Sequence, residues 1–167
     1  MRDQVQPPFA WSSRCLDPGE REPREHSDMA DSPLHPNILL VSRHYDDLIN
    51  RGDLSAADRD IHPAFVDHAA PPGAPVGPAG VKGWIAMVHD AFPDMTVTME
   101  DHVASGDLVG VVARWNGTHQ GPFRGIEATG RSVEFRGMVL WRIEDGLLAE
   151  RWAVLDNDLL IRTLQAR

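Results

Sequence analysis

The chain has 167 residues and a formal net charge of −9 at pH 7. This length suits one domain with a real hydrophobic core, and the acidic balance argues against nucleic acid or an anionic membrane surface as partner, because both attract basic faces. The single cysteine, Cys15, cannot form an internal disulfide and fits a reducing compartment. No stretch approaches the roughly 20 apolar residues of a membrane span or the apolar core of a signal peptide, so we expect a soluble, cytoplasmic protein.

Residues 1–36 differ in composition from the rest of the chain. They are rich in Pro, Glu, Asp and Arg and hold one small apolar cluster around Phe9 and Trp11. Such a segment buries too little apolar surface to offset the entropy lost on ordering, so we predict a disordered tail and place the folded domain at residues 37–167. Two interpretations stay open: Met29 as the start of a shorter product, and Phe9 with Trp11 as anchors that dock on a partner.

The domain begins with a predicted helix over residues 37–50. Apolar residues recur there at helical spacing, and the run stops at Gly52. Tyr45 lies on the apolar side of this helix. It is either a core residue with a hydrogen-bonded hydroxyl or a member of a catalytic site.

The segment that follows changes character twice. Pro63–His68 is typical of a short strand, and residues 69–80 form a Pro/Gly-rich loop of the kind that makes a rim over a site. Residues 80–92 then carry apolar side chains along one side, and Pro93 ends the run. This pattern predicts a second helix.

From residue 95 onward the pattern predicts strands joined by hairpin turns, and then a closing helix. The strands are expected at residues 95–104, 108–121, 131–144 and 147–156, and the helix at residues 159–165. Consecutive strands of this kind make an antiparallel meander. Helices first and a long curved sheet after them predict an α+β fold, in which the helices cover one face and a cone-shaped, mostly apolar pocket opens at one end.

The last predicted strand carries our main candidate for chemistry. Strict alternation puts the following side chains on one face of it: Leu148, Glu150, Trp152, Val154 and Asp156. A solvated face would not favour Leu, Trp and Val, and a core face would not favour two carboxylates, so we interpret this face as a wall of a partly apolar pocket. Asp156 is the residue that we expect to act. The competing interpretation is that it caps the helix that follows.

His68 and His119 lie at strand ends and are candidates for acid–base work, although a structural role competes for each. Trp115 shares a strand face with His119, whereas periodicity leaves open which face of residues 131–144 lines the pocket. The eight histidines include no His-x-His or His-x3-His pair, so no metal site is expected. Nucleophile-elbow, dinucleotide and phosphate-loop motifs are also missing from the sequence, so no motif in it supports serine-nucleophile chemistry or the binding of a dinucleotide or phosphate group.

Eight short motifs follow one another along residues 37–166. The first runs from Tyr45 to Asn50-Arg51-Gly52-Asp53. The next six are Phe65-Val66-Asp67-His68, Gly80-Val81-Lys82, Ala91-Phe92-Pro93-Asp94, residues 117–123, Thr129-Gly130-Arg131 and residues 142–146, and the last is Glu150-Arg151-Trp152 followed by Asp156. In this order they resemble the SnoaL-like polyketide cyclase, or ester cyclase, family. The resemblance implies a nuclear transport factor 2-like (cystatin-like) cone, a homodimer or higher homo-oligomer, and no cofactor or metal.

Characterised members of that family close a ring of an aromatic polyketide methyl ester by intramolecular aldol addition. Carried over by position, the family's aspartate of the last strand matches Asp156. It would take a proton from a carbon flanked by carbonyls and return one to the aldol oxygen, with His68, His119 and Tyr45 as candidate donors to the enolate. The expected contacts to a small hydrophobic substrate are Tyr45, Trp115, Glu150 and Trp152.

One departure from the family concerns Arg151, where many members have histidine. Strict alternation puts Arg151 on the face opposite Asp156, so we expect little effect on the chemistry. Ketosteroid isomerases, scytalone dehydratases and epoxide hydrolases run other reactions in the same cone, so an isomerase or hydrolase stays open beside the cyclase. The alternative outside enzymes is a binding module for a small apolar ligand or a partner chain.

Overall fold

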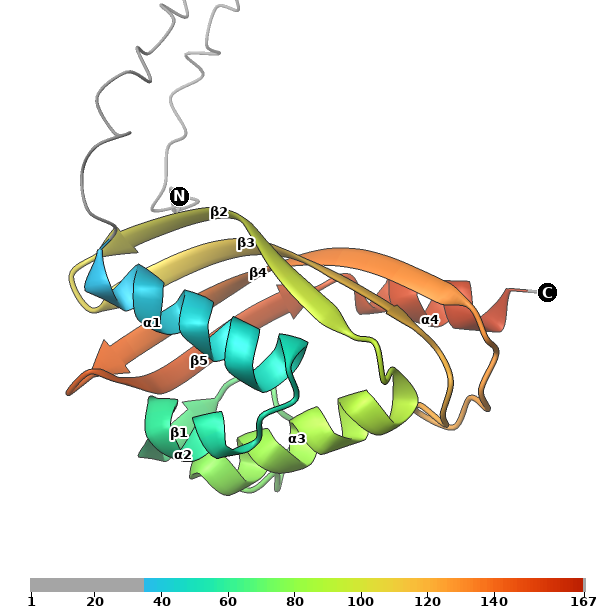
Figure 1. Ribbon diagram of the computed structural model, residues 1–167, viewed down its shortest axis with the longest axis horizontal. Coiled ribbons are helices and arrows are strands. Elements are labelled where there is room, and N and C mark those ends of the chain that lie inside the picture. Colours follow the sequence, from blue (N-terminus) through green and yellow to red (C-terminus); the bar gives the residue numbers. More distant parts are fainter. Residues whose placement is uncertain (1–34, 167) are drawn as a thin grey trace, which may run out of the picture. The chain divides into compact units, whose positions relative to one another are not determined.

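The computed structural model describes residues 35–166, and the predicted tail with Phe9, Trp11 and Met29 lies outside this range except for His35 and Pro36. Every helix and strand predicted from the sequence is present, with ends that differ by a few residues. In chain order (Figure 1) the elements are α1 Pro36–His44, the π-helical η2 Tyr45–Asn50, α2 Ser55–Asp60, β1 Ile61–Asp67, α3 Gly77–Ala91, β2 Thr96–Ser105, β3 Leu108–Thr118, β4 Ser132–Glu144, β5 Leu147–Leu155 and α4 Asn157–Gln165.

The strands form one five-stranded sheet in the order β1-β5-β4-β3-β2. The predicted meander is confirmed, because β2 to β5 are antiparallel neighbours. β1 joins at the far edge, parallel to β5, and pairs Val66 with Glu150 and Asp67 with Arg151. This parallel pairing was not predicted. It places side chains from the first half of the domain beside the last strand.

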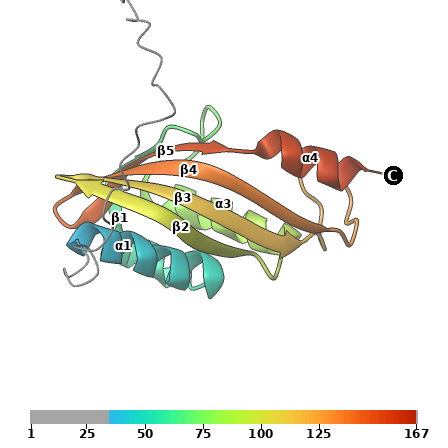
Figure 2. The same ribbon diagram turned by 90° about the horizontal axis from the view of Figure 1, so that it is seen from above.

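The sheet has an inner face, which packs against helices, and an outer face opposite to it. Figure 1 shows α1 and α3 below the arch of the long strands, and Figure 2, seen from above, shows α3 behind these strands. In β3 the side chains of Val109, Val111, Ala113 and Trp115 are buried, while the residues between them are partly exposed. Such alternation means that one face is covered and the other is not. The predicted α+β class, with helices on one face of a curved sheet, is therefore confirmed.

The first helix covers the inner face with an apolar stripe. Val41, Tyr45 and Leu48 are buried, and the helix widens to π geometry from Tyr45 onward. Asp60, at the end of α2, is fully buried and forms ion pairs with Arg43 and Arg59. No helix within residues 35–166 combines the length and the apolar character needed to cross a membrane.

A glycine sets the start of α3. Gly77 has a φ of +70°, and a Cβ added to it would lie 2.4 Å from the carbonyl oxygen of Pro63. Only glycine fits this backbone conformation at this distance, and Pro78 follows at the first turn, where its fixed φ favours a helix. The helix therefore starts earlier than predicted and packs close to β1.

Candidate functional site

Most of the predicted site residues lie on β5, which contains a β-bulge. Leu148 pairs with Ile143 of β4 and Glu150 pairs with Arg142, so Ala149 is an extra residue between them. A bulge reverses the alternation of side chains along a strand. Leu148 is therefore fully buried on the inner face, and the prediction that it shares a face with Glu150 is wrong. The outer face of β5 carries Glu150, Trp152 and Val154.

Three predicted residues meet on this outer face. The His68 ring stacks on Trp152 with 4.5 Å between the ring centroids and an angle of 6° between the planes. His68 Nε2 lies 2.8 Å from one carboxylate oxygen of Glu150, and Arg142 Nε lies 2.9 Å from the other. The hydrogen bond with His68 and the charge of Arg142 hold the pKa of Glu150 below its ordinary value. The cluster thus presents an ionised carboxylate that orients an imidazole, which is an arrangement found in general bases.

The larger of two described pockets adjoins this cluster. It is an outer-face groove with a volume of about 650 Å³, to which His68 also contributes. Its other walls are mainly apolar side chains of β2 to β5, among them Val103, Val112, Met138, Leu140, Trp152 and Val154. A volume of this size and an apolar lining with a few polar groups are typical of sites for small molecules or for a partner chain.

A second cluster of the same residue types lies on the inner face. The Trp141 indole N–H donates to the Tyr45 hydroxyl over 3.2 Å, and both side chains are buried. His44 packs edge-on against Trp141, with 5.4 Å between the ring centroids, and its Nδ1 has no partner among the described residues. Burial raises the pKa of Tyr45, and burial also lowers the pKa of His44 to about 4. Both groups are therefore neutral at pH 7.

Arg151 belongs to this inner cluster. Its guanidinium lies 5.8 Å from the centroid of Trp141 and forms an ion pair with Asp67 of β1 at 2.8 Å. The predicted face of Arg151, opposite to the outer side chains of β5, is confirmed. Because it lies near Tyr45, His44 and Trp141, Arg151 adds a cation to the inner face of the sheet.

Two predicted site residues are core residues. His119 is fully buried, its Nδ1 lies 3.0 Å from the hydroxyl oxygen of Thr129, and the backbone N–H of Thr129 donates to the same nitrogen over 3.3 Å. Its ring also packs against Phe92. Its Nε2 has no partner among the described residues. Trp115 is buried and stacks on Phe135 at 5.6 Å.

Asp156 lies at the junction of β5 and α4. Its side chain is exposed, and Oδ1 accepts the backbone N–H of Leu159 at 2.9 Å, which makes Asp156 the N-cap of α4. Its own backbone N–H donates to the carbonyl of Arg136 at 3.0 Å. The expected capping contact is therefore present. It occupies one of the two carboxylate oxygens.

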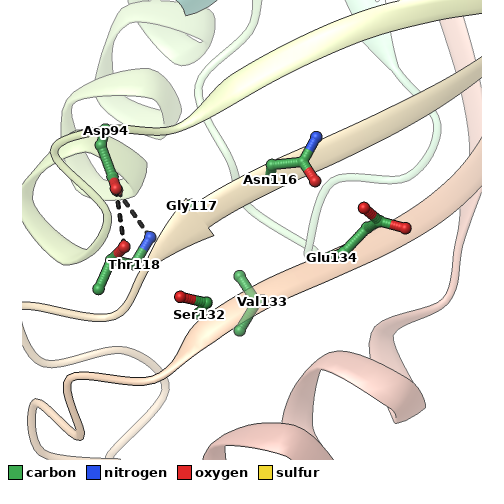
Figure 3. Close-up of a pocket in the computed structure, with 7 residues that line it drawn as sticks. All are labelled: Asp94, Asn116, Gly117, Thr118, Ser132, Val133 and Glu134. Carbon is green, nitrogen blue, oxygen red and sulfur yellow. Dashed lines mark hydrogen bonds between the residues drawn. The ribbon is translucent and has the colours of Figure 1, made fainter.

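The second pocket lies where β3 ends and β4 begins, and has a volume of about 380 Å³. Figure 3 shows Thr118 bound to Asp94, with Asn116 and Glu134 on neighbouring strands. The Asp94 carboxylate accepts the backbone N–H and the hydroxyl of Thr118 at 2.6 and 2.7 Å. These contacts fasten the end of β3 to the loop before β2. Of the residues that the structure describes, neither pocket is lined by Tyr45, His119 or Asp156.

The structure thus separates the predicted site into parts. His68, Glu150 and Trp152 meet on the outer face, Tyr45 lies on the inner face, and within residues 35–166 no hydrogen bond or ion pair joins any two of Asp156, His119 and His68. No group of three or more His, Cys, Asp or Glu side chains in the same range could hold a metal ion.

His44 is the polar residue that the sequence analysis missed. It falls between Val41 and Leu48 on the buried stripe of the first helix, beside Tyr45. A histidine at an otherwise apolar helical position is a signal that could have been read from the sequence.

Comparisons with known proteins agree with this fold. The family model described as SnoaL-like polyketide cyclase matches residues 39–164. Among solved structures, TsrD from Streptomyces laurentii is 28% identical with a TM-score of 0.74, and the match covers 82% of this chain and 100% of TsrD. A search of curated proteins finds no match.

Two further structures carry names that suggest chemistry. IdmH from Streptomyces antibioticus, a proposed polyketide cyclase, is 33% identical with a TM-score of 0.67, over 78% of this chain and 98% of IdmH. AclR from Streptomyces galilaeus, a proposed hydroxylase, is 27% identical with a TM-score of 0.66, over 76% of this chain and 93% of AclR. The fold is therefore nuclear transport factor 2-like, and the chain belongs to the SnoaL-like polyketide cyclase family.

Proposed function

We propose that this chain is an acid–base enzyme that closes a ring in a hydrophobic, polyketide-type carbonyl compound by intramolecular aldol addition, or catalyses a related isomerisation or hydrolysis. The family and the names of its structural neighbours support a general cyclase or isomerase role. In this proposal side chains alone supply the chemistry, within a catalytic domain of residues 37–167 that works as a homo-oligomer.

The observation that carries the proposal is the setting of Asp156. Its backbone is fixed by Arg136, and Oδ1 is held by the N–H of Leu159, while no described residue bonds Oδ2. A carboxylate that is fixed in direction and open to solvent on one oxygen can accept a proton from a bound compound. Capping and catalysis are therefore compatible in Asp156.

The proposed reaction neither consumes nor releases a proton overall. Asp156 takes a proton from a carbon between two carbonyls, and the resulting enolate carbon attacks a second carbonyl carbon of the same molecule. A carbon–carbon bond forms, the attacked C=O becomes an alkoxide, and the proton held by Asp156 returns to that oxygen. Tyr45, His68 and His119 stay predictions as donors to the enolate, and Trp115, Glu150 and Trp152 stay predictions as substrate contacts.

The test is the variant Asp156→Asn, with Asp158→Asn as its matched control. Asparagine caps a helix about as well as aspartate, so Asp156→Asn removes the base and keeps the cap. Asp158 is an exposed aspartate in the first turn of the same helix. We expect turnover of a polyketide methyl ester to fall about 10²- to 10⁴-fold in Asp156→Asn and to stay unchanged in Asp158→Asn. Equal turnover in the two variants would rule out the role of Asp156.

The outer-face groove favours a second candidate, the non-catalytic binding module. Its apolar walls and its volume of about 650 Å³ suit a ligand that is held without reaction. A thermal-shift panel of polycyclic ketones, polyketide esters, steroids and terpene epoxides separates the two candidates. A ligand that stabilises the wild type and Asp156→Asn equally and is recovered unchanged would favour the binding module.

A further inference from the structure

One arginine on the inner face of the sheet keeps hydrogen-bond donors that no described residue uses. The side chain of Arg151 is 17% exposed, and within residues 35–166 its guanidinium donates one hydrogen bond, from Nη1 to Asp67 at 2.8 Å. We propose that Arg151 binds the carboxylate of an acidic substrate, so that this chain prefers a free acid to its methyl ester. This inference rests on the proposed function for treating the bound compound as a substrate, and it deepens that function by naming the charge of the compound.

Asp67 leaves one edge of the guanidinium open. Its Oδ2 meets only Nη1, while its Oδ1 accepts the backbone N–H of Ala69 at 2.9 Å. The Nε and Nη2 groups of Arg151 form the edge that holds a carboxylate through two parallel hydrogen bonds. Arg136 uses this edge to hold both oxygens of Glu100, at 2.8 and 3.2 Å. Neither atom of Arg151 is among the buried polar atoms without a partner, so its open edge reaches solvent.

The charges on this side of the fold also favour an anion, although the whole chain has a net charge of −9. The ion pairs of the first two helices and of β1 with β5 join four arginines to three aspartates: Arg43, Arg51, Arg59, Arg151, Asp47, Asp60 and Asp67. One positive charge is therefore in excess. His44 and Tyr45 add none, because both are neutral at pH 7. A local excess of positive charge in an acidic protein draws an anion to this face.

The inner face offers apolar surface beside Arg151. β1 pairs with β5 only as far as Asp67 and Arg151, so no strand pairs with that edge of β5 from there to Leu155. Ala153 and Leu155, the next inner-face residues of β5, are only partly buried and pack against the core. The apolar part of a bound acid can lie over these two side chains while its carboxylate meets the guanidinium.

The charge of Arg151 is also what distinguishes this chain from the many family members that have histidine at this position. A guanidinium stays charged at every physiological pH, whereas a histidine near its ordinary pKa is mostly neutral at pH 7. A carboxylate accepts from both Nε and Nη2 and brings the opposite charge, but an ester carbonyl brings one neutral acceptor oxygen. The arginine therefore changes which compound is bound and leaves the acid–base chemistry to other residues.

The test is isothermal titration calorimetry at pH 7 with anthraquinone-2-carboxylic acid and its methyl ester, which share a flat ring system and differ in charge. We expect the wild type to bind the acid about 10- to 100-fold more tightly than the ester. Arg151→Gln should lose this preference and still bind the ester. Asp67→Asn removes the competing charge and keeps an acceptor for Ala69, so it should bind the acid more tightly than the wild type does. Arg142→Gln is the matched variant, since Arg142 lies 5.8 Å from a tryptophan on the outer face, and it should keep the preference.

Several results would overturn the inference. They are equal affinity of the wild type for acid and ester, binding of neither compound, and a folded Arg151→Gln that loses acid and ester alike, which would mean a structural role. A preference that is lost in Arg142→Gln would place the acid on the outer face. Circular dichroism shows whether each variant is folded, and if Arg151→Gln is not, an unchanged acid affinity in Asp67→Asn decides against the proposal. Asp156→Asn should bind the acid as the wild type does, so a failure of the proposed base is seen in turnover alone.

Discussion

The two faces of the sheet carry the same set of residue types in opposite environments. On the inner face, His44 packs on Trp141, and Arg151 lies 5.8 Å from the same indole and pairs with Asp67. On the outer face, His68 stacks on Trp152. Arg142 lies 5.8 Å from that indole and pairs with Glu150. Each cluster is a histidine, a tryptophan, an arginine and a carboxylate.

The difference lies in solvent. His44 and Trp141 are buried, and within the described residues the imidazole of His44 forms no hydrogen bond or ion pair with a carboxylate. Burial is therefore the main influence on its protonation and lowers its pKa to about 4. His68 is half-exposed and has Glu150 as its partner. The residue types alone therefore do not set the role of a cluster. Its role depends on whether water can supply a hydrogen bond that a polar side chain does not receive from the protein.

The largest expected effect compares the two tryptophans. Trp141→Ala removes a buried ring that contacts His44, Tyr45 and Phe65, so we expect it to lower the free energy of unfolding by about 3 to 5 kcal/mol. Trp152→Ala removes a half-buried ring, and its cost in the monomer should be about 1 kcal/mol. Urea denaturation of both variants measures the difference. Equal losses would show that the two clusters do not differ in burial energy.

The next effect concerns pH and His44. Its pKa is about 4 in the folded chain and about 6.5 in the unfolded chain, so the unfolded state binds more protons between these values. The contribution of the neutral ring is complete above pH 6.5 and is lost as the pH falls toward 4, by roughly 3 kcal/mol at most. Burial is the main cause of the lowered pKa, with Arg151, Arg59 and Arg43 adding to it and Asp60 opposing it.

Denaturation of the wild type and of His44→Gln at pH 7 and pH 5 checks this expectation. The wild type should lose stability between the two values, and His44→Gln should lose less, because it lacks the buried imidazole of His44. The exposed carboxylates with lowered pKa values become protonated only below pH 5, so they do not contribute to the difference in stability between pH 7 and pH 5. The same loss in both proteins would mean that another group causes the pH dependence.

The sequence predicts the elements of this fold well because periodicity reports on local burial. The first helix and the last four strands follow directly from apolar spacing and from the turns at Ser105-Gly106-Asp107 and Glu144-Asp145-Gly146. The bulge at Ala149 could not be predicted in this way, because nothing local shows that one residue is extra. That single residue decides that Leu148 is core and that Glu150 lies outside.

The candidate site was less predictable because it depends on distant pairings. His68 meets Glu150 only because β1 lies parallel to β5, a pairing between residues 82 positions apart that hairpin turns do not indicate. Tyr45 was expected to have a bonded hydroxyl if it lay in the core, and it does. Its neighbour His44 is harder to predict, because a histidine on an apolar helical stripe is the only local sign that this ring is buried.

The smallest expected effect is that of Glu150→Gln, which breaks the outer cluster without touching its rings. The pKa of Glu150 lies below its ordinary value, chiefly through the hydrogen bond with His68, so its contribution is present at neutral pH and is lost as the pH falls through the folded pKa. Glu150 stays open to solvent in the single chain, where salt screens such pairs. We therefore expect a small drop in melting temperature that vanishes at high salt.

The control is Glu127→Gln, which changes an exposed glutamate that forms no ion pair within the described residues. We expect Glu127→Gln to leave the melting temperature unchanged at low and at high salt. An equal drop in both variants would mean that the loss of one negative charge, and not the contact with His68, causes the effect. The outer cluster would then add nothing to stability, and solvent exposure would be the lasting difference between the two histidine–tryptophan pairs.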